Sequence, residues 1–403
     1  MIDVYLKTNR PISLTSIICK LLEGIIRDNI INHLKDNKLL STKQFGFLKG
    51  RSTTLQLLKI LDDWTEILES GDLIDVVYTD FQKAFDTVPH RRMLTKLEAY
   101  GINGNLLEWI RSFLTNRKQR VKIKGRTSSW SDVISGVPQG SVLGPILFVI
   151  YINDIIDNLN CDAYLYADDM KVYTRVSNDT DRARLQTDVD AVVEWTDKWL
   201  LKLNISKCKV VTIGRDTDSR QYPYWIMQNN TLHALATSTG ERDLGVTVDS
   251  NLNFDMHIQE IVNKANKILG VIKRSFKYLD YTTLALLYKA MVRSHLEYAQ
   301  NVWSPHKLKS IDILEKVQRR ATKIIPGLSK LPYNQRLQKL HLPTLAYRRK
   351  RGDMIETFKI LNGLYDKEAC ISLKRAIYSN TRGNSMKLYK LPSKNNTRKF
   401  FFL

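Results

Sequence analysis

The sequence predicts a mixed α and β part up to about residue 250 and an all-α part after it. Two observations carry this prediction. Before residue 250, short apolar runs of strand length alternate with stretches whose apolar residues recur every three or four positions. From about His257 onward, only the helical spacing remains. The boundary is placed where the strand-length runs stop.

The first elements follow from the period of the apolar residues. Apolar side chains from Ile17 to Ile26 recur at helical spacing and predict a helix. Turn-forming residues at 41–53 predict a loop, and an amphipathic pattern predicts a second helix from about Thr53 to Leu68. Residues 73–79, Leu-Ile-Asp-Val-Val-Tyr-Thr, then predict a buried strand that ends at Asp80.

The remaining elements complete the two parts. In the first part they are a helix after Pro89, an exposed strand at Arg120–Gly125, a buried helix at Val142–Ile156, strands at Ala163–Tyr166 and Met170–Val176 joined by a tight turn, a helix at Asp179–Leu201, and short strands at Lys209–Ile213 and Leu244–Val248. Three apolar stripes in the second part predict helices at Ile258–Ile272, Leu284–His295 and Ile313–Ile324. The tail beyond about Leu373 is polar and basic, and we expect it to be partly disordered.

The composition indicates a folded protein with a polyanionic partner. Of the 403 residues, 43% are hydrophobic and 26% are charged, which excludes collagen, mucin-like stalks and a mostly disordered chain. Lys and Arg total 62 against 41 for Asp and Glu, and the net charge of +21 favours nucleic acid as the partner, with an anionic membrane surface second. The membrane alternative lacks support because no long apolar face rich in Trp or Phe accompanies the basic residues.

The cysteines, histidines and apolar runs exclude several other classes. The four cysteines are far apart with no metal-like spacing, which predicts a reducing compartment. The seven histidines show no ligand-like pair, so a zinc finger is not predicted. The longest apolar run, Val142–Ile152, is too short to span a bilayer. No secretory signal is visible, because Asp3 interrupts the first apolar stretch.

Two adjacent carboxylates in Tyr166-Ala-Asp-Asp169 form the first candidate site. They lie in the tight turn between two predicted strands, where like charges repel each other. The pair becomes favourable when a divalent cation lies between the side chains of Asp168 and Asp169. An ordinary turn is the alternative, because Asp is a common turn residue.

Asp80 supplies a third carboxylate at the end of the buried strand. We expect its side chain at an edge of the sheet, and its alternative role is to cap the next helix. Together with Asp168 and Asp169, it can supply the ligand set for two Mg²⁺ ions roughly 3.5–4 Å apart, which clamp the attacking and leaving oxygens of an in-line displacement.

A glycine-rich loop at residues 135–145, Ser-Gly-Val-Pro-Gln-Gly-Ser-Val-Leu-Gly-Pro, precedes the predicted buried helix. Gly136, Gly140 and Gly144 would let a substrate approach the backbone closely. The N-terminus of the helix that follows suits a phosphate group. A plain connection between a strand and a helix has the same pattern and is the alternative.

In this order along the chain, the three segments resemble the motifs of the reverse transcriptase family, most closely those of non-LTR (LINE-like, jockey-type) retrotransposons. Asp80–Val88 resembles the first catalytic motif of the family, Gly136–Pro145 the second, and Tyr166–Asp169 the third. Four further segments are similar to the fingers and later palm motifs of the family: Arg10–Leu14, Gln44–Thr53, Leu203–Lys209 and Leu244–Val246. The resemblance covers about residues 9–350.

The resemblance implies an α+β right-hand polymerase fold, in which a palm with an antiparallel sheet and packed helices lies between fingers and an all-α thumb. The implied reverse transcriptase domain covers residues 1–250, with fingers at about 1–70 and palm at about 71–250. A helical thumb at 251–330 and a basic C-terminal extension at 331–403 would follow. Met1–Thr8 do not resemble the upstream fingers strands of the family, and we therefore expect a chain truncated at its N-terminus.

The resemblance also implies an RNA-directed DNA polymerase that uses two Mg²⁺ ions, or Mn²⁺. Asp80, Asp168 and Asp169 would be the catalytic residues and metal ligands, with the backbone carbonyl of Phe81 as a further ligand. The implied nucleotide-binding residues are Phe85, Gln139, Gly140 and Lys207.

Individual roles follow from the matching positions. Phe85 lies where the family has an aromatic steric gate, and a core phenylalanine is the alternative. Gln139 would contact the incoming nucleotide, and Lys207 would meet its triphosphate. Asp86 is expected to be structural, as a cap of the next helix.

Five basic residues are candidates for contact with nucleic acid. Lys49 and Arg51 lie in the segment that resembles the fingers motif and would contact the template strand or the substrate. Lys316, Arg320 and Lys323 stand at i, i+4 and i+7 of a predicted thumb helix and therefore share one face. A solvated loop and a solvated helix face are the respective alternatives.

The implied partners are an RNA template, a DNA primer and dNTPs, with no membrane and with an endonuclease supplied by an upstream segment or another protein. A catalytically silent, nucleic-acid-binding remnant of such an element is the alternative function. We expect an intracellular protein with nuclear access for insertion. The basic residues 348–351 have the composition of a nuclear signal, or of a solvated helix face.

Overall fold

The computed structural model describes residues 13–123, 125–215, 222–376, 387–390 and 392–402. Within these ranges the chain forms two compact units. The first contains residues 13–49, 75–210 and 222–237, and the second contains residues 50–74, 211–215 and 238–402. Met1–Thr8 and Arg10–Ile12, on which part of the predicted fingers motif falls, lie outside the described residues.

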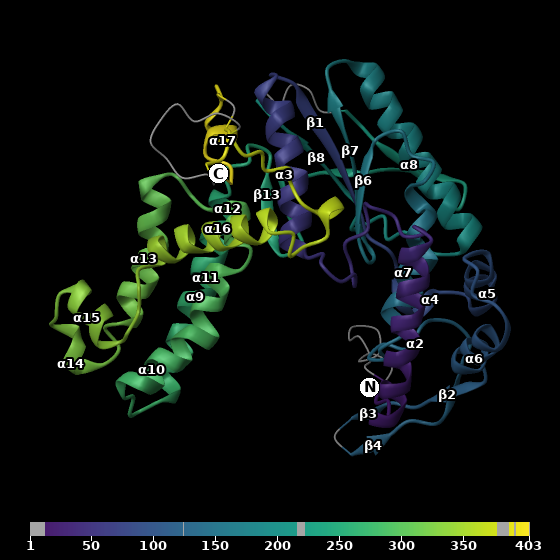
Figure 1. Cartoon of the computed structure of the whole chain (residues 1–403), viewed down its shortest axis with the longest axis horizontal. Helices are drawn as coiled ribbons and strands as arrows, with labels where there is room; N and C mark the ends of the chain where they lie inside the picture. The colour runs from purple at the N-terminus through teal and green to yellow at the C-terminus, as the bar shows by residue number, and fades with distance from the viewer. Residues whose placement is uncertain (1–12, 124, 216–221, 377–386, 391, 403) are drawn as a thin grey trace. The chain divides into compact units, whose positions relative to one another are not determined.

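A five-stranded sheet contains most of the predicted strands (Figure 1). Its order is β11-β8-β1-β7-β6, and Figure 1 labels β8, β1, β7 and β6. The strands are β1 at Leu73–Thr79, β6 at Asp162–Tyr166, β7 at Asp169–Val176, β8 at Lys209–Ile213 and β11 at Ala236–Thr237. β6 and β7 form an antiparallel hairpin, and β8 and β11 pair in parallel. The buried strand and the tight hairpin predicted from the sequence are confirmed.

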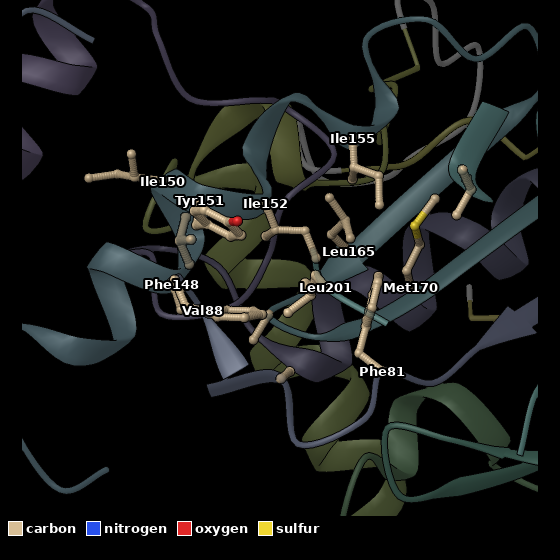
Figure 2. Close-up of a cluster of buried hydrophobic side chains, with 14 of the residues drawn as sticks. Phe81, Val88, Phe148, Ile150, Tyr151, Ile152, Ile155, Leu165, Met170 and Leu201 are labelled. Atoms are coloured by element: carbon tan, nitrogen blue, oxygen red, sulfur yellow. The ribbon is translucent and has the colours of Figure 1, made fainter. Parts of the chain in front are cut away.

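Two helices pack with this sheet in one hydrophobic core. In α7, Gly144–Ile152, every residue except Pro145 is buried, and a short 3-10 turn at Asn153–Ile156 completes the predicted buried helix. α8 covers Asp179–Trp199 and packs against β7. Figure 2 shows Leu165 and Met170, on either side of the hairpin turn, in the same buried cluster as α7. The core therefore anchors both strands of the hairpin next to its turn.

The other elements of the first unit are shorter. They are α4 (Ala84–Thr87), α5 (His90–Ala99), α6 (Gly104–Leu114), the strand pair β2 (Arg117–Gln119) and β5 (Ser131–Val133), the pair β3 (Lys122–Ile123) and β4 (Arg126–Thr127), and the pair β9 (Trp225–Gln228) and β10 (Thr231–Ala234). The single strand predicted at Arg120–Gly125 is wrong in its bounds. Arg120 and Val121 separate β2 from β3, and these two strands pair with different partners.

The first helix, α2, is longer than predicted and has two different halves. It covers Ile17–Asp36, and the hydroxyl of Ser16 caps it by accepting a hydrogen bond from the Cys19 amide. Its C-terminal half packs into the core through Ile30 and Leu34. Its N-terminal half exposes large apolar side chains, with Ile18 80% exposed; the others are Ile17, Leu21, Leu22 and Ile25.

The second unit is mainly helical, as predicted after residue 250. Its elements are α3 (Thr53–Glu69), the hairpin β12 (Gly240–Asp243) and β13 (Val246–Asp249), α9 (Asp255–Ser275), α10 (Tyr281–Leu287), a π-helical turn (Tyr288–Arg293), α11 (Ser294–Glu297), α12 (Gln300–Trp303), α13 (Leu308–Ala321), α14 (Pro326–Ser329), α15 (Tyr333–Lys339), α16 (Leu345–Leu361), a 3-10 turn (Lys367–Ala369) and α17 (Asn396–Lys399). The three helices predicted in this part correspond to α9, to α10 with its continuation, and to α13. The α+β fold class is confirmed.

Helices beyond residue 330 pack with those before it. α13 contacts α9 on one side and α16 on another, and α16 also contacts α12. The fully buried Gln318 of α13 binds the Tyr288 and Tyr333 hydroxyls. Helices on both sides of residue 330 therefore pack together, and the predicted thumb and extension bounds stay a prediction.

The tail predicted to be partly disordered falls in part on residues 377–386, 391 and 403, which lie outside the described residues. In the described part, Arg398 of α17 forms an ion pair with Asp62 of α3. None of the described helices combines the length and the apolar character needed to cross a bilayer.

Candidate active site

The turn between β6 and β7 carries Asp168 and Asp169. Tyr166 pairs with Asp169 in the hairpin register, so Ala167 and Asp168 form the turn itself. Ala167 has φ of +57°, a left-handed conformation that an alanine adopts at a cost of about 1–3 kcal/mol. Because Leu165 and Met170 are held in the core, this turn is fixed at both ends.

Asp80 lies at the same edge of the sheet as the turn. It follows β1 directly, and β1 neighbours β7. The Thr79 hydroxyl donates a hydrogen bond to the Met170 carbonyl at 3.2 Å, which places the end of β1 beside the start of β7. The predicted alternative, a helix cap, is excluded for Asp80 because the N-cap of α4 is Lys83.

Residues 202–208 run along the segment after β1. Gln82 donates its amide hydrogen to the Lys202 carbonyl at 2.8 Å, and Asn204 donates to the Asp80 carbonyl at 2.7 Å. The Cys208 thiol lies 3.5 Å from the Asp80 amide nitrogen, and burial raises the pKa of this thiol to about 11. The thiol therefore stays protonated at neutral pH.

Lys207 is brought next to Asp80 by this arrangement. Its Nζ lies 3.4 Å from Oδ1 of Asp80, and about two-thirds of its side chain remains exposed. The same Oδ1 atom is buried and has no hydrogen-bond partner among the described residues. A buried carboxylate oxygen of this kind needs a positive neighbour, which Lys207 partly supplies.

The glycine-rich loop is joined to the segment around Phe85 by hydrogen bonds. The Val137 amide donates to the Phe85 carbonyl and the Gly136 amide to the Val88 carbonyl, both at 2.8 Å. Gly136 has φ of +90°, and a Cβ atom there would lie 2.6 Å from the carbonyl oxygen of Asp86. Only glycine fits this close approach, so the loop depends on it.

Gln139 lies in the glycine-rich loop, and Phe85 lies in the segment to which this loop is hydrogen-bonded. The Gln139 side chain donates to Oδ1 of Asp86 at 2.7 Å. The Phe85 ring stacks on Phe148 of α7 with centroids 4.4 Å apart and packs nearly perpendicular to the Phe47 ring at 6.2 Å, while the Phe85 side chain stays partly exposed. The predicted cap role of Asp86 is wrong, because α5 begins at His90 after Pro89 and Asp86 instead holds Gln139.

A glutamate that was not singled out in the sequence occupies the N-terminus of α7. Glu23 of α2 is buried, and its Oε2 accepts hydrogen bonds from the Val142 and Leu143 amides at 2.7 and 3.1 Å. A carboxylate thus sits where a phosphate was expected at this helix end. A lone acidic residue within an apolar stretch was the only local signal for it.

The comparison with known proteins fits this arrangement. Residues 5–282 match the family described as reverse transcriptase (RNA-dependent DNA polymerase).

The chain belongs to the reverse transcriptase family.

Relatives of this reverse transcriptase chain come from mobile elements, as predicted. It is 30% identical over 346 residues to the RNA-directed DNA polymerase from mobile element jockey of Drosophila funebris, covering 81% of this chain and 36% of that protein. It is 26% identical over 332 residues to the probable RNA-directed DNA polymerase from transposon X-element of Drosophila melanogaster, covering 79% and 35%. The chain spans about a third of the length of these relatives.

Among solved structures, the chain is similar to telomerase from Candida albicans in complex with a fragment of telomeric RNA. The TM-score is 0.45 and the identity is 11%, over 78% of this chain and 58% of that one. Telomerase from Candida tropicalis without a ligand gives a TM-score of 0.45 at 12% identity, over 79% and 53%.

The carboxylates of this reverse transcriptase chain have the oxygen donors that a divalent ion prefers. Asp80 presents a buried oxygen without a hydrogen-bond partner among the described residues, which fits a metal ligand. In the part of the chain that the structure describes, no three His, Cys, Asp or Glu side chains converge closely enough to hold an ion. Asp80, Asp168 and Asp169 therefore share one sheet edge, and their side chains are not already arranged as a metal site in the described structure. Enzymes of this family use divalent ions.

Of the five predicted nucleic-acid-binding residues, four are exposed and one is not. Lys49, Lys316, Arg320 and Lys323 are exposed. Arg51 is only 6% exposed in its side chain and forms ion pairs with Asp366 at 2.8 Å and with Glu368 at 3.7 Å. Its solvated alternative is excluded, and its contact with nucleic acid stays a prediction.

Two basic side chains of α13, those of Lys316 and Arg320, have partners in the structure. Lys316 forms an ion pair with Asp312 at 2.9 Å, and Arg320 donates to the Asn266 side chain at 3.2 Å. α13 ends at Ala321, so Lys323 lies just beyond the helix on which it was placed.

Proposed function

We propose that this chain is an RNA-directed DNA polymerase of a non-LTR retrotransposon, which joins dNTPs to a primer 3′-hydroxyl on an RNA template. One observation carries the proposal: the segment after β1 and the β6–β7 turn bring Asp80, Asp168 and Asp169 to one edge of one sheet. Membership of the reverse transcriptase family supports nucleotide transfer at that edge. The chain spans about a third of the length of its relatives. The polymerase activity of this chain is therefore a proposal.

The proposed reaction is an in-line displacement. The primer 3′-oxygen attacks the α-phosphorus of the dNTP, the bond from this phosphorus to the bridging oxygen breaks, and pyrophosphate leaves. Two Mg²⁺ ions, or Mn²⁺, bound by the three carboxylates and the Phe81 carbonyl would lower the pKa of the hydroxyl and neutralise the leaving oxygens.

The side chains around this edge have defined parts in the proposal. Lys207, next to Asp80, would turn its ammonium group to the triphosphate when the ions neutralise that carboxylate. Gln139, held by Asp86, and Gly140 would line the place of the incoming nucleotide. Phe85 would present the exposed part of its side chain to the sugar.

Primer extension tests the proposal. The whole chain is incubated with poly-rA, oligo-dT, dTTP and Mg²⁺, and the product lengths are measured with and without EDTA. Metal-dependent extension supports the polymerase. Binding of the template–primer without any extension would instead support the silent remnant.

Phe85→Val is expected to relax sugar selection. The smaller side chain makes room for a 2′-hydroxyl, so ribonucleotide incorporation relative to dNTP should rise by about tenfold or more. The alternative, a purely core phenylalanine, predicts a stability loss of about 1–3 kcal/mol and an unchanged sugar preference. Phe113→Val, which removes a ring stacked on Trp109 in α6, is the matched control and should leave the preference unchanged.

Replacing Lys316, Arg320 and Lys323 by Gln is expected to weaken binding to many nucleic-acid sequences alike. The slope of log affinity against log salt should fall by about one unit for each phosphate that the variant no longer neutralises. The rate at saturating template should stay the same. The control replaces Lys374, Lys387 and Lys390 by Gln and so removes the same charge. If the two triple variants have the same salt slope, the α13 face is only a solvated surface.

The remaining partners belong to the proposal as well. An endonuclease from an upstream segment or another protein, together with nuclear access, would be needed for insertion into a chromosome. The basic residues 348–351 give little support for a nuclear signal. Arg348 forms an ion pair with Glu297, and Arg349 is buried.

A further inference from the structure

Residues 43–47 run beside β6, the strand that leads into the Asp168 turn. The Phe45 amide donates to the Leu165 carbonyl at 2.7 Å, and the Leu165 amide donates to the Lys43 carbonyl at 3.0 Å. Gln44 and Leu165 thus form a parallel bridge. The segment adds to the sheet at β6, two residues before Ala167.

The side chain of Gln44 binds the turn itself. Its Oε1 accepts a hydrogen bond from the Ala167 amide at 3.0 Å and another from the Gly46 amide at 2.7 Å. Both neighbours are N–H donors, so the oxygen of the side-chain amide must face them. Gln44 is fully buried and Ala167 nearly so, which strengthens the bond because water does not compete for it.

Gly46 lets the segment come this close. A Cβ atom at Gly46 would lie 2.4 Å from the Ala167 nitrogen and 3.0 Å from the Tyr166 carbonyl carbon. Both atoms belong to the backbone and cannot swing away. The glycine is therefore required by space, since its φ is not in the left-handed region.

The same segment reaches the proposed nucleotide site at its other end. Phe47 has φ of +59°, and its ring packs nearly perpendicular to the Phe85 ring, with centroids 6.2 Å apart. A short stretch of the chain thus contacts the turn that carries Asp168 and the aromatic ring proposed to face the sugar.

We propose that Gln44 is a positioning residue that holds the Ala167–Asp168 turn with Ala167 in its left-handed conformation and so sets the direction of the Asp168 and Asp169 carboxylates. The inference rests on the proposed polymerase for its catalytic consequence. The bond from Gln44 to Ala167 can be tested without any activity.

Three variants separate positioning from simple burial. Gln44→Met keeps the length of the side chain and removes the acceptor. Gln44→Glu keeps an acceptor, whether its carboxyl group is ionised or not. Gln56→Met changes an equally buried glutamine in α3, which takes no part in the proposed site.

Amide hydrogen exchange at Ala167 is the readout that needs no catalysis. Exchange should speed up by about tenfold or more in Gln44→Met and stay near wild type in Gln44→Glu and Gln56→Met, because only the first variant lacks the bond. Unchanged exchange in a folded Gln44→Met protein would overturn the proposal. If that protein lacks a cooperative thermal transition, Gln44→Asn, one methylene too short to reach Ala167, takes its place with the same expectation.

Primer extension then tests the consequence. Gln44→Met should lower kcat by about 10- to 100-fold through misplacement of the carboxylates, raise the half-maximal Mg²⁺ concentration, and change the KM for dNTP by less than about threefold. Gln44→Glu should restore most of kcat. The positioning role would be contradicted if Gln44→Glu lost as much kcat as Gln44→Met. It would also be contradicted if Gln56→Met raised the half-maximal Mg²⁺ concentration to the same extent. A wild-type protein that extends no primer would refute the polymerase, while the exchange result would still decide on the turn.

Discussion

Asp168→Asn is expected to abolish primer extension and to leave the fold intact. The substitution keeps the volume of the side chain and removes a formal charge that would face the divalent ions. Loss of one carboxylate ligand removes several kcal/mol of charge stabilisation, which corresponds to at least about a thousandfold in rate. The fold should survive because the turn is held by Leu165, Met170 and the Ala167 amide, none of which changes.

The measurements are single-turnover primer extension and thermal unfolding of the same protein samples. Asp162→Asn is the matched control, because Asp162 lies at the other end of β6, where it forms an ion pair with Lys43 at 2.8 Å. That variant should extend primers at close to the wild-type rate. An Asp168→Asn protein that did so too would show that this carboxylate is not part of the catalytic site.

Asp75→Ala is expected to cost about 3–5 kcal/mol of stability, because it removes one partner of a buried ion pair. Asp75 lies in the middle of β1 and is fully buried. Its Oδ2 accepts a hydrogen bond from the Tyr224 hydroxyl at 2.7 Å and lies 3.2 Å from Nε of Arg182. Burial, together with this carboxylate, raises the pKa of Tyr224, so its hydroxyl stays a donor. Alanine would leave the Arg182 guanidinium buried without its buried counter-charge.

Urea unfolding provides the measurement, and the same arginine provides the control. Asp179 also pairs with Arg182, at 3.1 Å, but its side chain is 87% exposed. Asp179→Ala should therefore change the stability by no more than about 1 kcal/mol. Equal effects of the two substitutions would mean that the buried pair contributes no more than a surface pair.

The sequence was sufficient for the parts of the site that depend on local pattern. The apolar run before Asp80, the two strands around Asp168 and the apolar helix after Gly144 each have a period that can be read without a partner. Their order along the chain then indicated the family. That Asp80 and Asp168 share a sheet edge followed from the family resemblance, and the strand order β1-β7-β6 agrees with it.

The residues that support the site were not predicted, because their partners are distant in the sequence. Glu23 binds amides about 120 positions away, and Gln44 binds an amide 123 positions away. A helical or strand period names no partner for such a residue. Glu23 and Asp75 had a local signal, since a charge inside an apolar stretch or a buried strand needs a partner, although the sequence could not name that partner.

Two detailed predictions failed for the same reason. Asp86 has the right chemistry for a cap, yet it lies inside α4 and its carboxylate binds the Gln139 side chain of the glycine-rich loop. Residues 120–125 alternate like one strand, yet β2 pairs with β5 and β3 pairs with β4, and Arg120 and Val121 separate β2 from β3. In both cases a tertiary contact overrode a local preference.

The apolar N-terminal half of α2 has a consequence for the colloidal behaviour of the chain. A net charge of +21 keeps copies of the molecule apart at low ionic strength. Salt screens that repulsion within about 10 Å at 0.1 M, and it leaves the attraction between exposed stripes of Ile18, Leu21 and Ile25 in place. Higher ionic strength, which would also weaken the proposed binding to nucleic acid, therefore favours self-association of the chain.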